Sequence, residues 1–236
     1  MSRIIESLLD LDFYKLTMAQ LVYELFPQVP VRYSFVNRTT SVPLANYIRE
    51  EDLRDQLNSI CQLQYTPAEI DYLNEQKIFS PEFLGFLASL KLTPPTLEKI
   101  GEQYKIEVNG PWSETIFWET FILSTVNELY YKTLLNQKPH KTPIENLVTA
   151  FNEGTKRLQA KIEILKQHPE IQIVDFATRR RFNRPWHRYV VTLTKETIPR
   201  QLIGTSNVLL AKELNLKPIG TFAHEVPMVY SGIYHG

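Results

Sequence analysis

The fold is decided by IQIVDFATRRR (residues 171–181), QLIGTSN (201–207) and KPIGTFAHE (217–225). Each stretch begins as a short apolar run typical of a strand and ends in polar or reactive side chains. Helix-like sequence separates them, which predicts a β-α-β-α-β series with parallel strands. Ligands bind at the C-terminal ends of such strands, so we expect the three polar ends to face one site.

The sequence before this region predicts helices and a few strands. Apolar side chains at helical spacing predict helices at residues 11–26, 44–60, 114–135 and 143–167. Alternating patterns predict strands at 31–37 and 104–108, and Asn109-Gly110-Pro111 predicts a turn. Thr66 with Glu69, and Ser80 before Pro81, are typical of helix starts. We place a boundary near residue 112, between an α+β domain (1–112) and a parallel βαβ domain (113–236).

The composition of the chain excludes several classes of protein. The chain has 236 residues, of which 43% are hydrophobic and 22% charged, as in globular proteins. Lys+Arg and Asp+Glu balance at 26 each, so no overall field attracts nucleic acid or membranes. The single Cys61 excludes an internal disulfide framework. No signal peptide and no apolar run of about 18 residues is found, so we expect a cytoplasmic protein.

The stretch RRRFNRPWHR (179–188) contains five arginines and His187. A planar guanidinium matches phosphate and carboxylate geometry, and Arg179 follows the predicted strand end at Phe176 by three residues. This favours a site for an anionic ligand. An ion-paired face and a nucleic-acid patch remain alternatives.

The other two strand ends carry hydroxyl, amide and imidazole groups. Gly204-Thr205-Ser206-Asn207 suits phosphate or ribose oxygens, or else simply caps the following helix through Ser206 or Asn207. His224, with Glu225 beside it, can act as a base, a metal ligand or a phosphoryl-accepting nucleophile, or can be a structural histidine. No other His or Asp lies nearby at ligand spacing, so we predict no metal ligands. The remaining histidines are assigned no role: His140, His168, His187 and His235.

Four ordered stretches resemble one enzyme family. They are LLDLDFYKLTMAQ (8–20), GPWSETIFWET (110–120), DFATRRRF (175–182) and LIGTSNVLLAKELNLKPIGTFAHE (202–225). They are similar to the N-terminal part of nicotinate phosphoribosyltransferases, and the resemblance runs from about residue 8 to 225. Ala177 replaces the glycine of the usual DFGTRR, and Val226-Pro227 follows AHE where bacterial members commonly have Trp.

The resemblance implies an α/β fold. An N-terminal α+β domain would be followed by the first strands and helices of an irregular, TIM-like α/β barrel, incomplete in this chain because family members continue much further. The implied reaction joins nicotinate to 5-phosphoribosyl 1-diphosphate in NAD biosynthesis, with ATP hydrolysis and Mg²⁺. The family's active site forms across a homodimer interface.

The resemblance also implies residue roles. His224 would be the phosphate-accepting histidine, with Glu225 a catalytic neighbour and Thr221 in contact with nicotinate or nucleotide. Tyr14 would stack on the pyridine ring from the neighbouring subunit, and Phe176 would cover the opposite ring face. The remaining implied substrate-binding residues are Arg179, Arg180, Ser206 and Asn207.

Three other functions stay open at this point. The chain can be a catalytically silent fragment or split subunit that dimerises or binds ligand without turnover. It can be a sibling enzyme acting on nicotinamide or quinolinate, since base choice depends largely on residues beyond these stretches. A nucleic-acid binder using the arginines of 179–188 would show affinity that falls steeply with salt.

Overall fold

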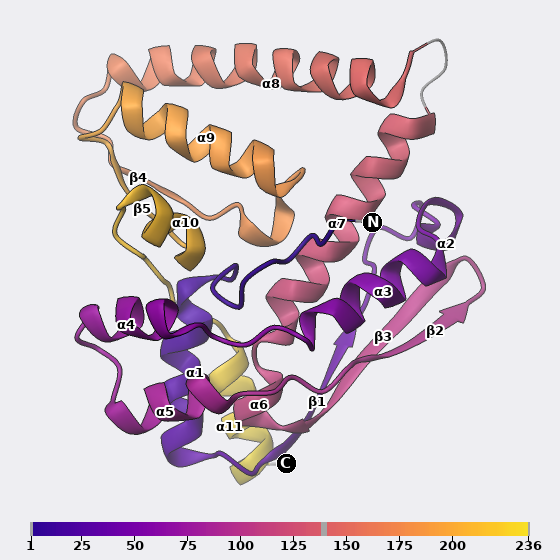
Figure 1. Ribbon diagram of the computed structural model, residues 1–236, viewed down its shortest axis with the longest axis vertical. Helices are drawn as coiled ribbons and strands as arrows, with labels where there is room; N and C mark the ends of the chain where they lie inside the picture. The colour runs from indigo at the N-terminus through magenta and orange to yellow at the C-terminus, as the bar shows by residue number, and fades with distance from the viewer. Residues whose placement is uncertain (1, 138–140, 236) are drawn as a thin grey trace.

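The computed structural model describes residues 2–137 and 141–235. Figure 1 shows one long diagonal helix, α7 (Trp118–Gln137), that links two regions of the molecule. The N-terminal strands and helices surround its first half, whereas α8 (Pro143–Lys166) and α9 (Arg184–Thr197) lie toward its other end. His140, to which the sequence analysis assigns no role, lies outside the described residues.

The N-terminal region is built on a three-stranded antiparallel sheet with the order β1-β3-β2. Its strands are β1 (Pro30–Phe35), β2 (Thr96–Ile100) and β3 (Gln103–Pro111). The helices around it are α1 (Phe13–Leu25), α2 (Leu44–Tyr47), α3 (Glu50–Ile60), α4 (Pro67–Glu75) and α5 (Pro81–Ser89). The predicted capping box of Thr66 and Glu69 is confirmed, as is the Ser80 cap.

Two predictions for this region are wrong. The helix expected at 44–60 is broken at Ile48 and Arg49, which are extended. This break buries Ile48 and lets its carbonyl accept a hydrogen bond from Tyr104 at 2.7 Å. The turn expected at 109–111 is the end of β3, because pairing with β1 continues to Pro111 opposite Pro30. Strand β2 was not predicted, since Leu97 is its only buried residue and the alternation is weak.

The helix predicted at 114–135 is two helices, α6 (Trp112–Thr115) and α7. They are separated at Ile116 and Phe117, and both of these side chains are buried in the core. Helix α7 is buried around most of its first three turns, as its apolar sequence predicts. Among the described residues, no helix combines the length and the apolarity that a membrane crossing requires.

The C-terminal region contains the predicted parallel β-α-β unit. Strand β4 (Ile173–Asp175) pairs with β5 (Leu202–Thr205), and α9 connects them. A short 3₁₀ turn, η1 (Thr178–Arg180), follows β4, and α10 (Val208–Leu214) follows β5. Asn207 caps α10 by accepting the Leu210 N–H, and Asn215 ends that helix at φ 49°.

The strand predicted at 217–222 does not form. Its only ladder contact is an isolated bridge between Thr205 and Pro218, in which Thr205 donates to the Lys217 carbonyl at 3.1 Å and Ile219 donates to the Thr205 carbonyl at 2.9 Å. Because Thr205 is the last residue of β5, the pairing ends there. The chain then turns into α11 (Glu225–His235), which returns to α1 (Figure 1). The expected third parallel strand is therefore reduced to one bridge.

One apolar core extends across the predicted boundary at residue 112. It unites Leu9 and Trp112 with Phe121 of α7, Val208 of α10 and Val226 of α11. A smaller cluster of Val191, Leu202 and Leu210 lies between the β4–β5 sheet and its helices. The division into domains stays a prediction, and the packing on either side of it is continuous.

Gly204 is required by the close approach of the segment after α10. A Cβ atom there would lie 2.3 Å from the Lys217 carbonyl oxygen and 2.7 Å from Ile219. Gly204→Ala should therefore lower the free energy of unfolding by about 1–3 kcal/mol, measured by urea denaturation. Gly85→Ala is the matched control: it lies in α5 with no atom within 4 Å of the new Cβ, so it should stabilise by about 0.5–1 kcal/mol. Equal effects of the two changes would contradict this packing.

Candidate active site at the strand ends

The N-terminal segment lies along the ends of β4 and β5. Phe13 donates its N–H to the Ser206 carbonyl at 2.7 Å, and Ser206 donates to the Asp175 carbonyl at 2.7 Å. Asp12 and Asn207 form an isolated antiparallel bridge. The start of α1 is thereby fixed beside the strand ends, where the sequence places the candidate ligand site.

Arg179 and Tyr14 are brought together at this edge. The Arg179 Nε atom pairs with Asp12 Oδ2 at 2.9 Å, and its Nη1 donates to Glu119 Oε1 at 2.7 Å. Its guanidinium carbon lies 5.4 Å from the centroid of the Tyr14 ring, a cation–π distance. With 35% of its side chain exposed, Arg179 remains reachable by an anionic ligand.

Tyr14 itself is 2% exposed in the single chain, and its hydroxyl has no hydrogen-bond partner among the described residues. Burial raises the pKa of this phenol. Gly220 packs against the backbone of Tyr14, because a Cβ at Gly220 would lie 3.0 Å from the Tyr14 backbone nitrogen. The predicted stacking role of Tyr14 remains a prediction.

Four predicted residues present exposed side chains. Phe176, at the end of β4, is 43% exposed, and Arg180, Thr221 and His224 are also exposed. Neither His224 nor Thr221 makes a side-chain hydrogen bond within 2–137 and 141–235. The described contacts thus give His224 no structural task, whereas its exposure suits a reactive group.

Glu225 is held by three other side chains. One carboxylate oxygen pairs with the Lys15 ammonium. The other accepts from the Tyr33 hydroxyl and, at 3.2 Å, from Trp112 Nε1. These contacts anchor the start of α11, and with it His224, against the N-terminal region. The catalytic role predicted for Glu225 stays a prediction, and its contacts are those of an anchor.

Ser206 and Asn207 are fully buried. Ser206 donates to Asp12 Oδ1 at 2.8 Å, and Asn207 donates to Asp10 Oδ1 at 2.8 Å while its own oxygen caps α10. The capping alternative is confirmed for Asn207. A substrate contact by either side chain stays a prediction and requires these internal bonds to change.

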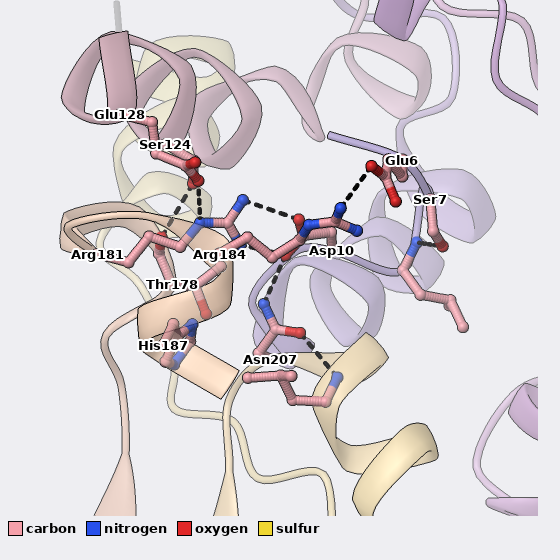
Figure 2. Close-up of polar contacts among 12 residues, drawn as sticks. Glu6, Ser7, Asp10, Ser124, Glu128, Thr178, Arg181, Arg184, His187 and Asn207 are labelled. Carbon is pink, nitrogen blue, oxygen red and sulfur yellow. Dashed lines mark hydrogen bonds and ion pairs between the residues drawn. The ribbon is translucent and has the colours of Figure 1, made fainter. Parts of the chain in front are cut away.

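Most of the arginine cluster is paired internally, as the ion-paired alternative expects. Figure 2 shows Arg181 between Asp10, at 2.5 and 2.9 Å, and Glu128, at 2.6 Å. Arg184 pairs with Glu6 at 2.5 Å, and Arg188 pairs with Glu213. Of the five, only Arg180 makes no ion pair within the described part of the chain.

The buried ion pairs of Arg181 join three parts of the chain. These are the N-terminal segment that contains Asp10, helix α7 and the turn after β4. A cavity of about 510 Å³ lies beside it, lined in part by Glu128, Tyr131 and Phe182, and none of the predicted site residues lines it. Burial raises the pKa of Glu128 despite the nearby Arg181, whereas Arg181 holds the pKa of Asp10 below its ordinary value against the effect of burial.

Sequence reasoning missed His187. Its Nε2 atom lies 2.7 Å from Asp175 Oδ2, which also accepts the Thr205 hydroxyl at 2.6 Å. The other Asp175 oxygen accepts the Ala177 N–H at 3.1 Å, and Ala177 has φ −89°, so alanine is tolerated there. These bonds fix the turn that carries Phe176 and Arg179. His187, Val191 and Thr194 share the buried face of α9, and that spacing was the available signal.

Fold and site together define an α/β protein whose polar residues gather at the ends of parallel strands, beside an N-terminal domain. Residues 9–127, half of the chain, match the nicotinate phosphoribosyltransferase N-terminal domain, and residues 171–234 match the nicotinate phosphoribosyltransferase family. The chain belongs to the nicotinate phosphoribosyltransferase family.

Three solved structures are similar to the whole chain. The nicotinate phosphoribosyltransferase of Vibrio cholerae is 30% identical with a TM-score of 0.79, over 99% of this chain and 54% of its own. That of Porphyromonas gingivalis is 27% identical with a TM-score of 0.83, over 98% and 57%. A putative nicotinate phosphoribosyltransferase of Saccharomyces cerevisiae is 28% identical with a TM-score of 0.78, over 99% and 58%. The chain therefore spans little more than half the length of these relatives, as expected for an incomplete barrel.

Removing Arg181 should destabilise the fold strongly. Arg181→Met leaves Asp10 and Glu128 buried without a cation, so we expect a loss of about 3–5 kcal/mol in the free energy of unfolding. Arg157→Met removes an exposed ion pair with Glu153 on α8 and should cost less than about 1 kcal/mol. Urea denaturation of both variants tests this, and losses of similar size would refute the role of Arg181.

Glu128 should make stability depend on pH. Its folded pKa lies above the ordinary value of 4.5, so the folded state favours the protonated acid. The resulting stabilisation is complete below that value and is lost as pH rises through the folded pKa. Glu128→Gln should therefore gain stability relative to the wild type as the pH is raised above the ordinary value of 4.5. A difference between the two unfolding free energies that stays constant or falls over this range would contradict the assignment.

Proposed function

We propose that this chain forms the base- and phosphate-binding half of a nicotinate phosphoribosyltransferase, which makes nicotinate mononucleotide in NAD biosynthesis. The observation that carries the proposal is Arg179 stacked over Tyr14 at the ends of two parallel strands, in a member of this family. Phe176, three residues before Arg179 at the end of β4, provides an exposed aromatic face for a flat base. The three similar structures, all named for this activity, support it.

The transfer step needs a bound base and a stabilised leaving group. The nicotinate ring nitrogen attacks C1 of 5-phosphoribosyl 1-diphosphate, the C1–N bond forms, and the C1–O bond to diphosphate breaks. We assign the charge of the phosphates to Arg179 and Arg180, because guanidinium groups stabilise phosphate oxygens electrostatically. Thr221, Ser206 and Asn207 are proposed to contact substrate.

The ATP-dependent step is assigned to His224. An imidazole nitrogen attacks the γ-phosphorus of ATP, the N–P bond forms, and the bond to the bridging oxygen breaks, releasing ADP. Water later cleaves the N–P bond and releases phosphate. Within 2–137 and 141–235, no group of three or more His, Cys, Asp or Glu residues is arranged to hold a metal ion. We propose that Mg²⁺ enters bound to substrate phosphates, which this ion commonly bridges in phosphate-transferring enzymes.

We also propose a cytoplasmic homodimer with the site at the subunit interface. Tyr14 of one subunit would stack on the pyridine bound by the other. Because its ring is 2% exposed in the single chain, this stacking requires that assembly or substrate binding uncovers it.

The second candidate is a catalytically silent fragment or split subunit. It is favoured by one observation: the chain covers 54–58% of the similar structures, so part of their fold has no counterpart here. Activity on nicotinamide or quinolinate is a further variant, decided by which base yields a nucleotide.

The test is nucleotide formation by the chain alone and by the polypeptide of its complete coding region, with phosphoribosyl diphosphate, Mg²⁺, ATP and each of the three bases. We expect nicotinate mononucleotide, formed faster with ATP. His224→Ala should lower ADP release by more than about a hundredfold, because removing the nucleophile closes the covalent route. His168→Ala, exposed after α8, should be unchanged.

Each outcome separates the candidates. If ATP leaves product formation unchanged and His224→Ala is fully active, the phosphohistidine mechanism is wrong. If the 236-residue chain binds nicotinate but nucleotide forms only with the polypeptide of the complete coding region, the 236-residue chain alone is catalytically silent.

A further inference from the structure

A buried lysine joins two carboxylates that come from distant parts of the chain. Lys15, on α1, is 0% exposed. Its ammonium lies 2.6 Å from Glu119 Oε2, on the first turn of α7, and it also pairs with Glu225 Oε2, at the start of α11. We call these three residues the lysine bridge. A fully buried ammonium is rare in proteins and is retained only where its charge is compensated.

Each end of the lysine bridge continues into the candidate site. The second oxygen of Glu119 accepts a hydrogen bond from Arg179 at 2.7 Å. The second oxygen of Glu225 is held by Tyr33 and Trp112, and His224 is the residue directly before Glu225. An unbroken series of ion pairs therefore runs from the Arg179 guanidinium to the residue beside the His224 imidazole.

The lysine bridge depends on charge at every step. Burial opposes ionisation of Glu119, yet Lys15 and Arg179 hold its pKa below the ordinary value. Asp12, which also pairs with Arg179, adds a third carboxylate to two cations, so the group already carries an excess of negative charge. A phosphoryl group on the adjacent histidine would add roughly two more negative charges. Lys15 is the cation placed to respond to this added charge, because it contacts the carboxylates of both Glu119 and Glu225.

We propose that Lys15 is a positioning residue that couples the state of His224 to the position of Arg179. The proposal rests on the proposed function, in which His224 accepts a phosphoryl group and Arg179 binds substrate phosphate. New negative charge beside Glu225 draws the Lys15 ammonium toward α11 and weakens the ion pair between Lys15 and Glu119. The ion pair between Glu119 and Arg179 then changes its geometry and moves the guanidinium. The affinity for phosphoribosyl diphosphate therefore differs between the free and the phosphorylated form of His224.

The coupling is measured as the KM for phosphoribosyl diphosphate with and without ATP, using the polypeptide that forms nucleotide. In the wild type, ATP should change this KM by roughly 5- to 150-fold, the usual range for coupled sites. Lys15→Met and Glu119→Gln should bring the ratio to about one while ADP release continues. Glu119→Gln keeps an oxygen to accept from Arg179, so it tests the lysine bridge even if Lys15→Met does not fold. Lys195→Met, which removes a partly buried lysine bonded to the Leu214 carbonyl, is the control and should keep the wild-type ratio.

A purely structural role for Lys15 gives a different result. The variants would then lower kcat equally with and without ATP and leave the KM ratio intact, which would overturn the proposal. If the wild type forms no nucleotide, the proposed function fails, and hydrogen exchange of the 236-residue chain decides about the lysine bridge. Faster exchange at 176–181 and 220–229 together in Lys15→Met or Glu119→Gln supports it, and a change in only one of these segments refutes it.

Discussion

The structure depends on the buried ion pair between Arg181 and Asp10. Asp10 belongs to the N-terminal segment and Arg181 to the turn after β4. Their two hydrogen bonds therefore join the N-terminal region to the C-terminal region. Glu128 of α7 completes the group. Because isolated buried charges are costly, this arrangement specifies one relative position of the three segments. With Asp10 fixed, Asp12 and Tyr14 follow along the chain to the strand ends.

Polar residues at the site therefore serve two tasks. Asp12, Glu119 and Lys15 set the positions of Arg179 and Glu225, whereas Phe176 and His224 remain exposed. The division follows from burial: groups that are already paired in the interior hold the geometry, and exposed groups are left to meet a ligand. The proposed chemistry assigns base stacking and phosphoryl transfer to the exposed set.

The sequence was sufficient for features set by local patterns. The caps at Thr66, Ser80 and Asn207, the β4–α9–β5 unit and the position of Arg179 after β4 follow from residue type and spacing. The resemblance to the family, carried by the ordered motifs, is confirmed by matches at 9–127 and 171–234.

Features set by long-range contacts were not predictable in the same way. The acids that pair with Arg181 lie at positions 10 and 128, so no local pattern marks that arginine as buried. The third strand failed because residues 217–222 meet β5 only at its last residue, Thr205, although the surrounding residues favour a strand. No local pattern marks Lys15 as buried, because its two partners, Glu119 of α7 and Glu225 of α11, lie far from it in the sequence.

The most direct test of a shared site at the strand ends is an NMR titration of the isotope-labelled chain with nicotinate and inorganic diphosphate. The account predicts that the Arg179 side-chain N–H and the His224 ring signals shift together with one saturation curve. Shifts confined to the cavity residues around Glu128, Tyr131 and Phe182, with Arg179 and His224 unchanged, would contradict it.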